Sequence, residues 1–506
     1  MSSSSVNEES SGGSTGTGAT EQTKQGFIRS IRLPTAIAIN MTQMCGIGPF
    51  ITIPLMVAAF GGPQAILGWI VGALLALSDG LIWAELGAAM PGAGGTYLYL
   101  REAFQYRTGR LMPFIFTWTA VLFIPLIMST GVIGLVQYLG YLWPNMSRLE
   151  IYLVSLLVVG VVFFALYRRV ESIGFLTRIL FVIMLVSIGT VIVASFTHFN
   201  PTLAFTYPAN AFTLNGRFFA GLGAGLIIGI YDYLGYNTTA YMGAEIRRPG
   251  RNIPWSIIIS ILGMMLLYLA LNIGVMGVVP WQKVATSSSI ASLVLEQVWG
   301  KVAASIVTVL ILITAFASVF AGLLGGSRVP YNAARDGVFL RQFGKLHPRH
   351  HFPHIALIVM CVITAIGSFF NLGLVISMLT AVIVIVQSLG QIAALTILRR
   401  RQPNLRRPYR MWLYPLFSII ALVGWVYVFI ASGLSINGTQ FQFILPIWTN
   451  PMILAIGWVV LASLPSSCGL VTLNIPGPSV PRKLRRNTWS TLSRKKCQPD
   501  RGSDRG

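Results

Sequence analysis

The residues best suited to chemistry form two glycine-containing interruptions inside apolar segments. The first, Cys45-Gly46-Ile47-Gly48-Pro49-Phe50, lies near the middle of the first apolar segment. Proline lacks an N–H group and clashes with the carbonyl four residues earlier, and glycine weakens a helix further. A helix broken there offers unpaired N–H groups, which suit a carboxylate, and unpaired C=O groups, which suit an ammonium or a metal cation. A zwitterionic amino acid matches both ends of such a break.

The second interruption lies in the sixth apolar segment, at Gly229-Ile230-Tyr231-Asp232-Tyr233-Leu234-Gly235-Tyr236-Asn237. It has no proline, but glycines, tyrosines and a carboxylate stand where plain hydrocarbon side chains are expected. Interrupted helices at corresponding places in two halves of a chain point to the binding site of a secondary transporter. The alternative is that these small residues serve only close packing between helices.

Four carboxylates are candidates for coupling or gating. Asp79 and Asp232 lie within apolar segments, where a charged carboxylate costs about 2.5–3.5 kcal/mol, so each needs a partner or a proton. We expect Asp232 to contact a substrate ammonium or to carry a proton; the alternative is a structural hydrogen bond, which is also the alternative for Asp79. Glu85 and Glu245 lie at cytoplasmic ends and are expected to pair with loop arginines, as a gate or as an anchor.

The segments that must position these residues are predicted to be membrane-spanning helices. Hydrophobic residues make up 54% of the 506 residues and charged residues 10%, whereas soluble chains are about a quarter charged. The apolar runs are continuous rather than alternating, which predicts an all-α polytopic fold. Twelve helices are expected, at 34–59, 64–90, 111–141, 150–167, 173–196, 218–243, 254–279, 300–325, 354–371, 373–397, 412–433 and 445–465. We interpret Asn371-Leu372-Gly373 as a tight turn between two of them; one long helix is the alternative.

The distribution of positive charge predicts the orientation of the chain. Cytoplasmic loops of membrane proteins are enriched in lysine and arginine. With the N-terminus in the cytoplasm, 32 of the 36 lysines and arginines fall in inside segments, and Arg148, Arg217, Lys283 and Lys301 fall outside. This asymmetry predicts a multi-pass protein of the cell membrane with both termini cytoplasmic. It also accounts for the net charge of +22 without nucleic acid as a partner.

The chain divides into five predicted parts. A serine- and glycine-rich leader, expected to be disordered, precedes two five-helix units of opposite orientation, an inverted repeat with discontinuous helices one and six. Two extra helices follow, and then a basic cytoplasmic tail that we expect to lie against anionic headgroups. These parts are residues 1–32, 33–196, 197–398, 399–465 and 466–506.

At four stretches the chain resembles the amino acid–polyamine–organocation superfamily of permeases. They occur in register between residue 33 and about residue 465. The stretches are Gly46-Ile47-Gly48-Pro49-Phe50; Ala84-Glu85-Leu86 through Pro91 and Gly94-Gly95 to Ala103-Phe104; Gly235-Tyr236-Asn237 through Glu245 and Pro249 to Arg251-Asn252-Ile253-Pro254; and Ser327-Arg328 through Ala334-Arg335-Asp336-Gly337 to His347-Pro348 and Pro353-His354.

The resemblance implies alternating access around a central site, with a bundle of helices one, two, six and seven rocking against the rest. By family position, the N–H groups of Ile47 and Gly48, next to Gly46, would hold the substrate carboxylate. The carbonyls of Met44, Tyr231 and Leu234 would hold the amino group.

Further site residues follow from the same resemblance. Tyr231 would be an aromatic lid, and Asn237, after Gly235, would be a polar group just past the break. Proton-coupled relatives often carry a lysine in the middle of helix five, where this chain has Val186-Ser187-Ile188-Gly189. Protons are the expected coupling ion, and sodium is the alternative.

These observations predict a secondary active transporter of amino acids, a symporter rather than an enzyme. A permease for polyamines or cationic amines is the alternative, because Asp232 could replace a substrate carboxylate. A membrane sensor that does not transport is an alternative of another class. The chain has no P-loop, no GxSxG elbow and no zinc-spaced Cys/His set, so no cofactor and no metal are expected.

Overall fold

The computed structural model describes most of the apolar part of the chain. The described residues are 29, 31–92, 94–167, 173–348, 352–437, 440–443, 446 and 449–467. Nearly all of the predicted leader and all of the tail beyond residue 467 lie outside the described residues, so those two parts stay predictions.

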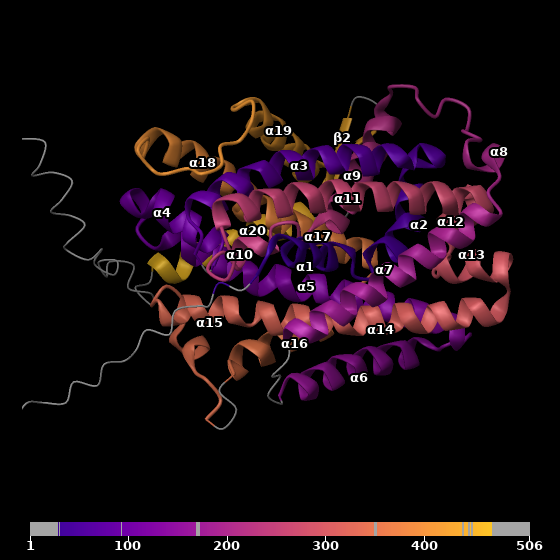
Figure 1. The fold of residues 1–506 in the computed structure, drawn as a ribbon, viewed down its shortest axis with the longest axis horizontal. Helices are drawn as coiled ribbons and strands as arrows, with labels where there is room; N and C mark the ends of the chain where they lie inside the picture. Colours follow the sequence, from indigo (N-terminus) through magenta and orange to yellow (C-terminus); the bar gives the residue numbers. More distant parts are fainter. Residues whose placement is uncertain are drawn as a thin grey trace, which may run out of the picture.

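Long helices lie side by side along the longest axis of the molecule (Figure 1). Within the described part of the chain, 6 helical segments are long and apolar enough to cross a membrane. They are α3 (Ile66–Ala89) with the short helix η1 (Pro63–Ala65) before it, α5 (Leu111–Leu142), α6 (Arg148–Leu166), α11 (Pro249–Val278), α14 (Lys301–Gly326) continuing into α15 (Arg328–Arg335), and α17 (Leu372–Ile383) continuing through the π-turn η3 (Val384–Ser388) into α18 (Leu389–Arg401).

The first predicted interruption is a sharp break between two short helices. Helix α1 (Leu33–Cys45) ends at Gly46, whose φ of +37° is strained for any residue with a side chain. Helix α2 (Gly48–Phe60) starts with Pro49 in its first turn, where a missing N–H costs nothing. The two axes are bent by 49°, and together they form a seventh apolar span.

The second predicted interruption is also present, without a proline. Helix α9 (Gly216–Tyr233) ends as Leu234 becomes extended, with ψ 132°. Gly235 then takes a φ of +117°, which glycine alone adopts readily. The chain resumes as the single turn of α10 (Thr238–Tyr241). A short non-helical segment, residues 234–237, therefore interrupts the sixth predicted helix.

The remaining apolar helices are shorter. Helix α16 ends at Gly367 and α17 begins at Leu372, so a turn separates the ninth and tenth predicted segments, as expected. The shorter apolar stretches are Phe181–Thr197 of α7 (Ile173–Thr197), α13 (Ile290–Trp299), α16 (His354–Gly367), α19 (Leu416–Ala431) and Pro451–Ala462 of α20 (Pro451–Ser467).

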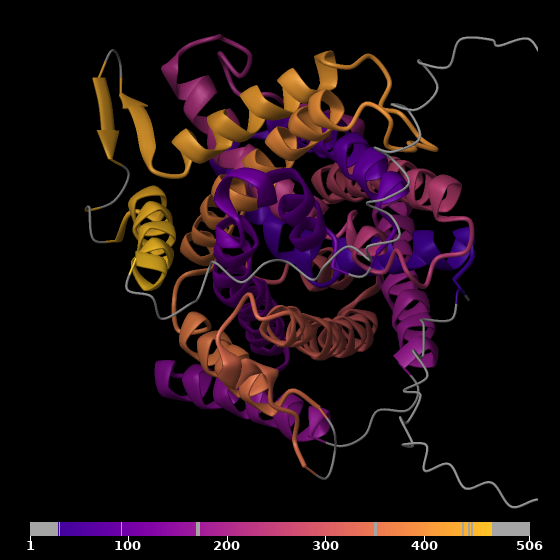
Figure 2. The same ribbon diagram turned by 90° about the vertical axis from the view of Figure 1, so that its left-hand side faces the viewer.

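Short helices mark the two ends of the bundle. Helices α4 (Thr96–Thr108), α10 and α15 lie at one end, and α8 (Pro201–Ala204), α12 (Trp281–Thr286) and α13 lie at the other (Figure 1). In the end view, α20 lies on the outside of the bundle (Figure 2).

A two-stranded hairpin departs from the predicted all-α fold. Strands β1 (Leu434–Asn437) and β2 (Gln440–Phe443) pair antiparallel, with Leu434 opposite Phe443. The sequence carries a recognisable signal, since Asn437 precedes a glycine and Asn-Gly favours tight hairpin turns. The described residues are otherwise helices and their connections.

Buried aromatic rings pack the helices behind the two breaks. Trp69 on α3 lies 4.9 Å from the ring of Tyr268 on α11, and Tyr233 on α9 lies 5.4 Å from the same ring. Such pairs contribute about 0.5–1.5 kcal/mol each beyond area burial. Helices α3, α9 and α11 are thereby held together directly behind the interrupted segments.

Candidate functional site

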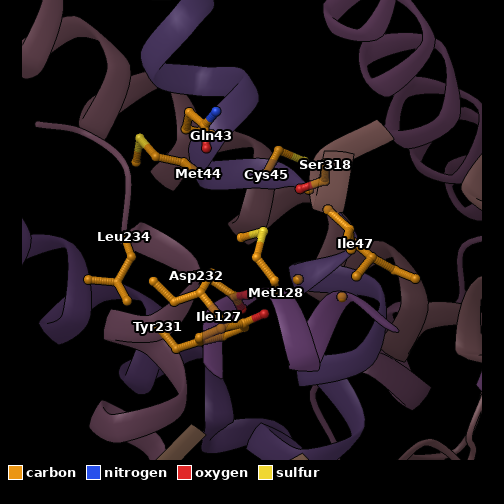
Figure 3. Close-up of a pocket in the computed structure, with 14 residues that line it drawn as sticks. Gln43, Met44, Cys45, Ile47, Ile127, Met128, Tyr231, Asp232, Leu234 and Ser318 are labelled. Atoms are coloured by element: carbon orange, nitrogen blue, oxygen red, sulfur yellow. The ribbon is translucent and has the colours of Figure 1, made fainter. Parts of the chain in front are cut away.

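The two breaks face each other across a small internal cavity. Its volume is about 40 Å³, and it lies between α1, α2, α5, α9 and α14 (Figure 3). The lining residues are Gln43, Met44, Cys45, Gly46, Ile47, Gly48, Ile127, Met128, Gly131, Tyr231, Asp232, Leu234, Ser318 and Val319. Seven of the nine predicted substrate-binding residues are among them: Met44, Gly46, Ile47, Gly48, Tyr231, Asp232 and Leu234.

The first break presents N–H groups to this cavity. Ile47 and Gly48 stand at the start of α2, and neither backbone N–H donates to another residue that the structure describes. The N–H of Phe50 is already bonded to the carbonyl of Ile47, at 3.2 Å. Free N–H groups at a helix N-terminus, together with the helix dipole, favour a negatively charged group.

The second break and the end of α1 present carbonyl groups. The Leu234 carbonyl accepts no hydrogen bond from the described residues. The carbonyls of Met44 and Tyr231 each accept one, from the Tyr268 hydroxyl at 3.0 Å and from the Leu234 N–H at 3.1 Å. A carbonyl oxygen has two lone pairs, so these two can still accept from an ammonium group.

Asp232 reaches from the second break to the first. Its side chain is 1% exposed, and one carboxyl oxygen, Oδ2, is hydrogen-bonded to the Thr52 hydroxyl of α2. The other oxygen, Oδ1, is buried without a partner among the described residues. A Cβ atom placed on Gly48 would lie 2.3 Å from Oδ1. The carboxyl group therefore lies directly against the N-terminus of α2.

Tyr231 is held by a neighbouring helix. Its hydroxyl lies 2.6 Å from the hydroxyl of Thr130 on α5. The ring lines the cavity, and the hydrogen bond fixes its outer end to α5.

Gly235 and Asn237, also predicted as substrate-binding, do not line the cavity in this structure. A Cβ on Gly235 would lie 2.8 Å from the Cβ of Gln43. This glycine therefore allows the non-helical segment, residues 234–237, to pack closely against α1. Asn237 is the residue before α10, and its side chain caps no helical N–H. Both residues shape the break rather than the cavity wall.

Several lining residues were not predicted from the sequence. Helix α5 contributes Ile127, Met128 and Gly131, and α14 contributes Ser318 and Val319. A usable signal exists, because Ser129-Thr130-Gly131 and Ser318 place small and polar residues inside long apolar runs. The apolar lining residues carry no such mark.

The amino acid permease family model matches residues 31–471. The chain belongs to this family. The branched-chain amino acid permease BcaP of Lactococcus lactis is 26% identical over 392 residues, which cover 75% of this chain and 84% of that protein. The Asc-type amino acid transporter 1 of Mus musculus is 27% identical over 453 residues, covering 86% and 79%. The serine/threonine exchanger SteT of Bacillus subtilis is 23% identical over 412 residues, covering 80% and 91%.

The match confirms the resemblance inferred from the four sequence stretches. It establishes the chain as a permease of this superfamily, embedded in a membrane by several helices, and not an enzyme. The relatives include both permeases and an exchanger, so membership leaves the coupling mode open.

Asp79 of the permease lies away from the cavity and is fully paired. Its carboxylate accepts hydrogen bonds from the Tyr236 hydroxyl at 2.6 Å and from the indole N–H groups of Trp83 and Trp425, each at 3.1 Å. Tyr236 belongs to the non-helical segment after α9. Asp79 therefore helps to position the second break, and its three donors partly offset the cost of burying a carboxylate.

Glu85 of the permease forms a buried ion cluster at the end of α3. Its carboxylate, in a side chain that is 1% exposed, accepts from Nε of Arg399 at 2.9 Å and from the backbone N–H of Met411 at 2.8 Å. Nε of Arg407 lies 3.4 Å away. Burial lowers the pKa of Arg407, and the Glu85 carboxylate opposes that shift. The predicted pairing with arginines is present and joins α3 to the segment after α18.

The predicted pairing of Glu245 with arginines is not present among the described residues. The backbone of Glu245 is used instead, because its carbonyl accepts from the N–H of Ile31 at 3.1 Å. Ile31 and Ile246 form an isolated parallel bridge at this point. Glu245 thus helps to attach the start of α1 to the segment before α11 through its main chain.

Proposed function

We propose that the protein is a secondary active transporter that carries an amino acid across the cell membrane by alternating access, coupled to protons. The observation that carries this proposal is the pair of breaks, with the free N–H groups of Ile47 and Gly48 on one side of a cavity and the free carbonyl of Leu234 on the other. These are complementary to the two charges of an amino acid. The relatives' names describe amino acid permeases, transporters and an exchanger.

The substrate's ends have distinct partners in this proposal. Its carboxylate binds the N–H groups of Ile47 and Gly48, and its ammonium binds the carbonyls of Met44, Tyr231 and Leu234. Its side chain points toward Ile127, Met128 and Val319, whose apolar surfaces favour an uncharged apolar side chain. A branched-chain or similar neutral amino acid fits this lining.

The cavity size supports a cycle that opens and closes. Small-molecule pockets usually measure about 300–1,000 Å³, whereas this cavity is about 40 Å³. Side chains and helices must therefore move apart to admit an amino acid. Tyr231, held by Thr130 of α5, is the lid in this proposal.

The proposed architecture has twelve spans built on an inverted repeat. One unit runs through α1–α2, α3, α5, α6 and α7, and the other through α9–α10, α11, α14, α16 and α17–α18. In each unit a broken helix and a long helix are followed by short connecting helices, α4 in one and α12 with α13 in the other. These connections lie at opposite ends of the bundle, as inversion requires (Figure 1). Helices α19 and α20 then lie outside the repeat, and both termini are cytoplasmic.

Asp232 is the proposed proton carrier. It supplies the carboxyl group among the described residues that line the cavity, and no lysine, arginine or histidine is among those lining residues. Asp79 and Glu85 are already paired with donors or arginines elsewhere. Buried ionisable groups in transport paths are typical proton sites. Sodium coupling is the alternative.

A permease for cationic amines is the second candidate function. Asp232 places a carboxyl group at the N-terminus of α2, where an amino acid would place its own. An amine without a carboxylate could then use Asp232 as its counter-ion.

Transport by the purified protein in liposomes tests these proposals. We expect saturable uptake of radiolabelled leucine that increases with an inward proton gradient and that putrescine does not compete for. Matched liposomes with a sodium gradient and no proton gradient separate the two ions. Uptake of putrescine without uptake of any amino acid would reject the first candidate in favour of the second. Tight leucine binding without flux would indicate a sensor.

A further inference from the structure

We infer that, in this structure, the Asp232 carboxyl group lies in the space that the substrate's carboxylate occupies when an amino acid is bound. It must be neutral, and must turn aside, before an amino acid can bind. The inference rests on the proposed function and adds a residue that sets specificity and pH dependence.

The Asp232 carboxyl group lies against the first residue of α2. Its Oδ1 atom lies so close to Gly48 that a Cβ there would be 2.3 Å away. The N–H groups of Ile47 and Gly48 are the free donors of this helix end. Oδ1 accepts from neither N–H, but it fills the space beside Gly48, so a substrate carboxylate that binds these donors would lie next to it.

The Oδ1 atom of Asp232 is buried. The Asp232 side chain is 1% exposed, and Oδ1 has no hydrogen-bond partner among the described residues. An ionised carboxylate oxygen left without a donor costs more than a neutral one. The closed conformation therefore favours the protonated carboxyl group.

The Thr52 hydroxyl supports the same protonation state. Its oxygen lies 3.0 Å from the Gly48 carbonyl and also contacts Oδ2 of Asp232. A hydroxyl has one hydrogen to donate. If Asp232 is protonated on Oδ2, it donates to Thr52 and Thr52 donates to the Gly48 carbonyl, so these three oxygen atoms all have a partner. If Asp232 is ionised, two acceptors compete for one hydrogen.

Among the residues that the structure describes, no positively charged group faces Asp232. The titratable groups facing it are Cys45 of α1, Tyr231 and Tyr233 of α9, and Tyr268 of α11. None of these becomes a cation. A substrate carboxylate beside an ionised Asp232 would meet an unshielded like charge, whereas a substrate ammonium would be attracted.

The affinity for each class of substrate should therefore depend on pH. Amino acids bind the form with neutral Asp232, so their affinity is full at acidic pH and is lost as pH rises through the titration of this group. Amines that lack a carboxylate show the opposite trend. Each effect reaches at most about tenfold per pH unit, since one proton is involved.

Paired ligands measured on the intact protein test the inference. Leucine and its decarboxylated analogue 3-methylbutylamine differ only in the carboxylate, and their dissociation constants can be measured in nanodiscs over an acidic-to-alkaline pH series. For the unmodified protein we expect leucine to weaken and the amine to tighten as pH rises. Leucine affinity that is independent of pH would overturn the inference while leaving amino acid transport intact. No leucine binding at any pH would instead reject the proposed function.

Variants sharpen the result. Asp232→Asn should bind leucine more tightly than the unmodified protein at alkaline pH, should lose the pH dependence, and should lose the amine. Glu102→Gln on α4, whose carboxylate is about one-third exposed and outside the cavity lining, is the matched control and should keep both pH trends. Weaker leucine binding by a folded Asp232→Asn variant at alkaline pH would contradict the inference. The unmodified protein decides the question if this variant does not fold.

Discussion

The hydroxyl of Tyr236 donates a 2.6 Å hydrogen bond to the carboxylate of Asp79, and so ties the non-helical segment after α9 to α3. The same carboxylate accepts from Trp425 of α19, a helix outside the proposed repeat. The shape of the second break thus depends on side chains that do not line the cavity.

Replacing Asp79 should destabilise the permease. Asp79→Ala leaves the buried donors of Tyr236, Trp83 and Trp425 without an acceptor, and each such loss costs about 1–3 kcal/mol. We expect a large fall in the midpoint of thermal unfolding in detergent. Tyr236→Phe removes only one of these bonds and should cost about 1 kcal/mol. Equal stability of Asp79→Ala and the unmodified protein would contradict the positioning role.

A side chain at Gly48 should close the site. In Gly48→Ala the new methyl group would meet Oδ1 of Asp232 at 2.3 Å, and Gly48→Leu would also fill the space beside the free N–H groups. We expect leucine binding, measured by scintillation proximity, to be lost in Gly48→Leu. Gly457→Ala on α20 is the control, because a Cβ there meets nothing within 4 Å. Normal leucine affinity in Gly48→Leu would mean that the break serves packing alone.

Neutralising Glu85 should loosen the connection between α3 and α18. Glu85→Gln leaves Arg399 and Arg407 without their buried counter-ion, and their side chains are 22% and 7% exposed. Removing one partner of a buried pair costs about 3 kcal/mol or more. Denaturation of the purified protein should show this loss. Glu102→Gln, from a pair with Arg101 in which both side chains are about 30% exposed, should cost less than about 1 kcal/mol; similar effects of the two variants would argue against a buried cluster.

Freeing Tyr231 from α5 should change transport more than stability. Thr130→Val removes the hydroxyl that lies 2.6 Å from the Tyr231 hydroxyl, and the loss of one such bond costs about 1 kcal/mol. Since a lid that is held less firmly opens more readily, we expect faster leucine release in stopped-flow measurements. Tyr231→Phe should show the same acceleration, because it removes the other half of the same bond. Unchanged release in both variants would exclude this contact as part of a lid.

The two interruptions could be predicted because their causes are local. Gly46, Gly48 and Pro49 disfavour a continuous helix wherever they stand, and Gly235 supplies the positive φ of the second break. The pairing of Glu85 with arginines was also foreseeable, since this carboxylate stands at the end of an apolar segment in a chain with many more positive than negative charges.

The partners of the buried aspartates could not be predicted in the same way. Asp232 meets Gly48 and Thr52, and Asp79 meets Trp425, across long stretches of chain. These contacts depend on which helix faces meet after packing, and apolar runs without strong periodicity do not specify a face. The same limit explains why the lining residues from α5 and α14 were missed.

The hydroxyl of Tyr268 contacts the carbonyl of Met44 at 3.0 Å and that of Asp232 at 2.9 Å. One phenol hydroxyl thus links the ends of the two broken helices, α1 and α9, to each other and to its own helix, α11. If the two breaks moved apart from each other, the contacts of the Tyr268 hydroxyl would be lost. If both breaks moved together, away from α5 and α14, these contacts would be kept. We therefore expect the substrate to enter between the group formed by α1, α9 and α11 and the group formed by α5 and α14. Tyr268 would then move together with α1, α9 and α11.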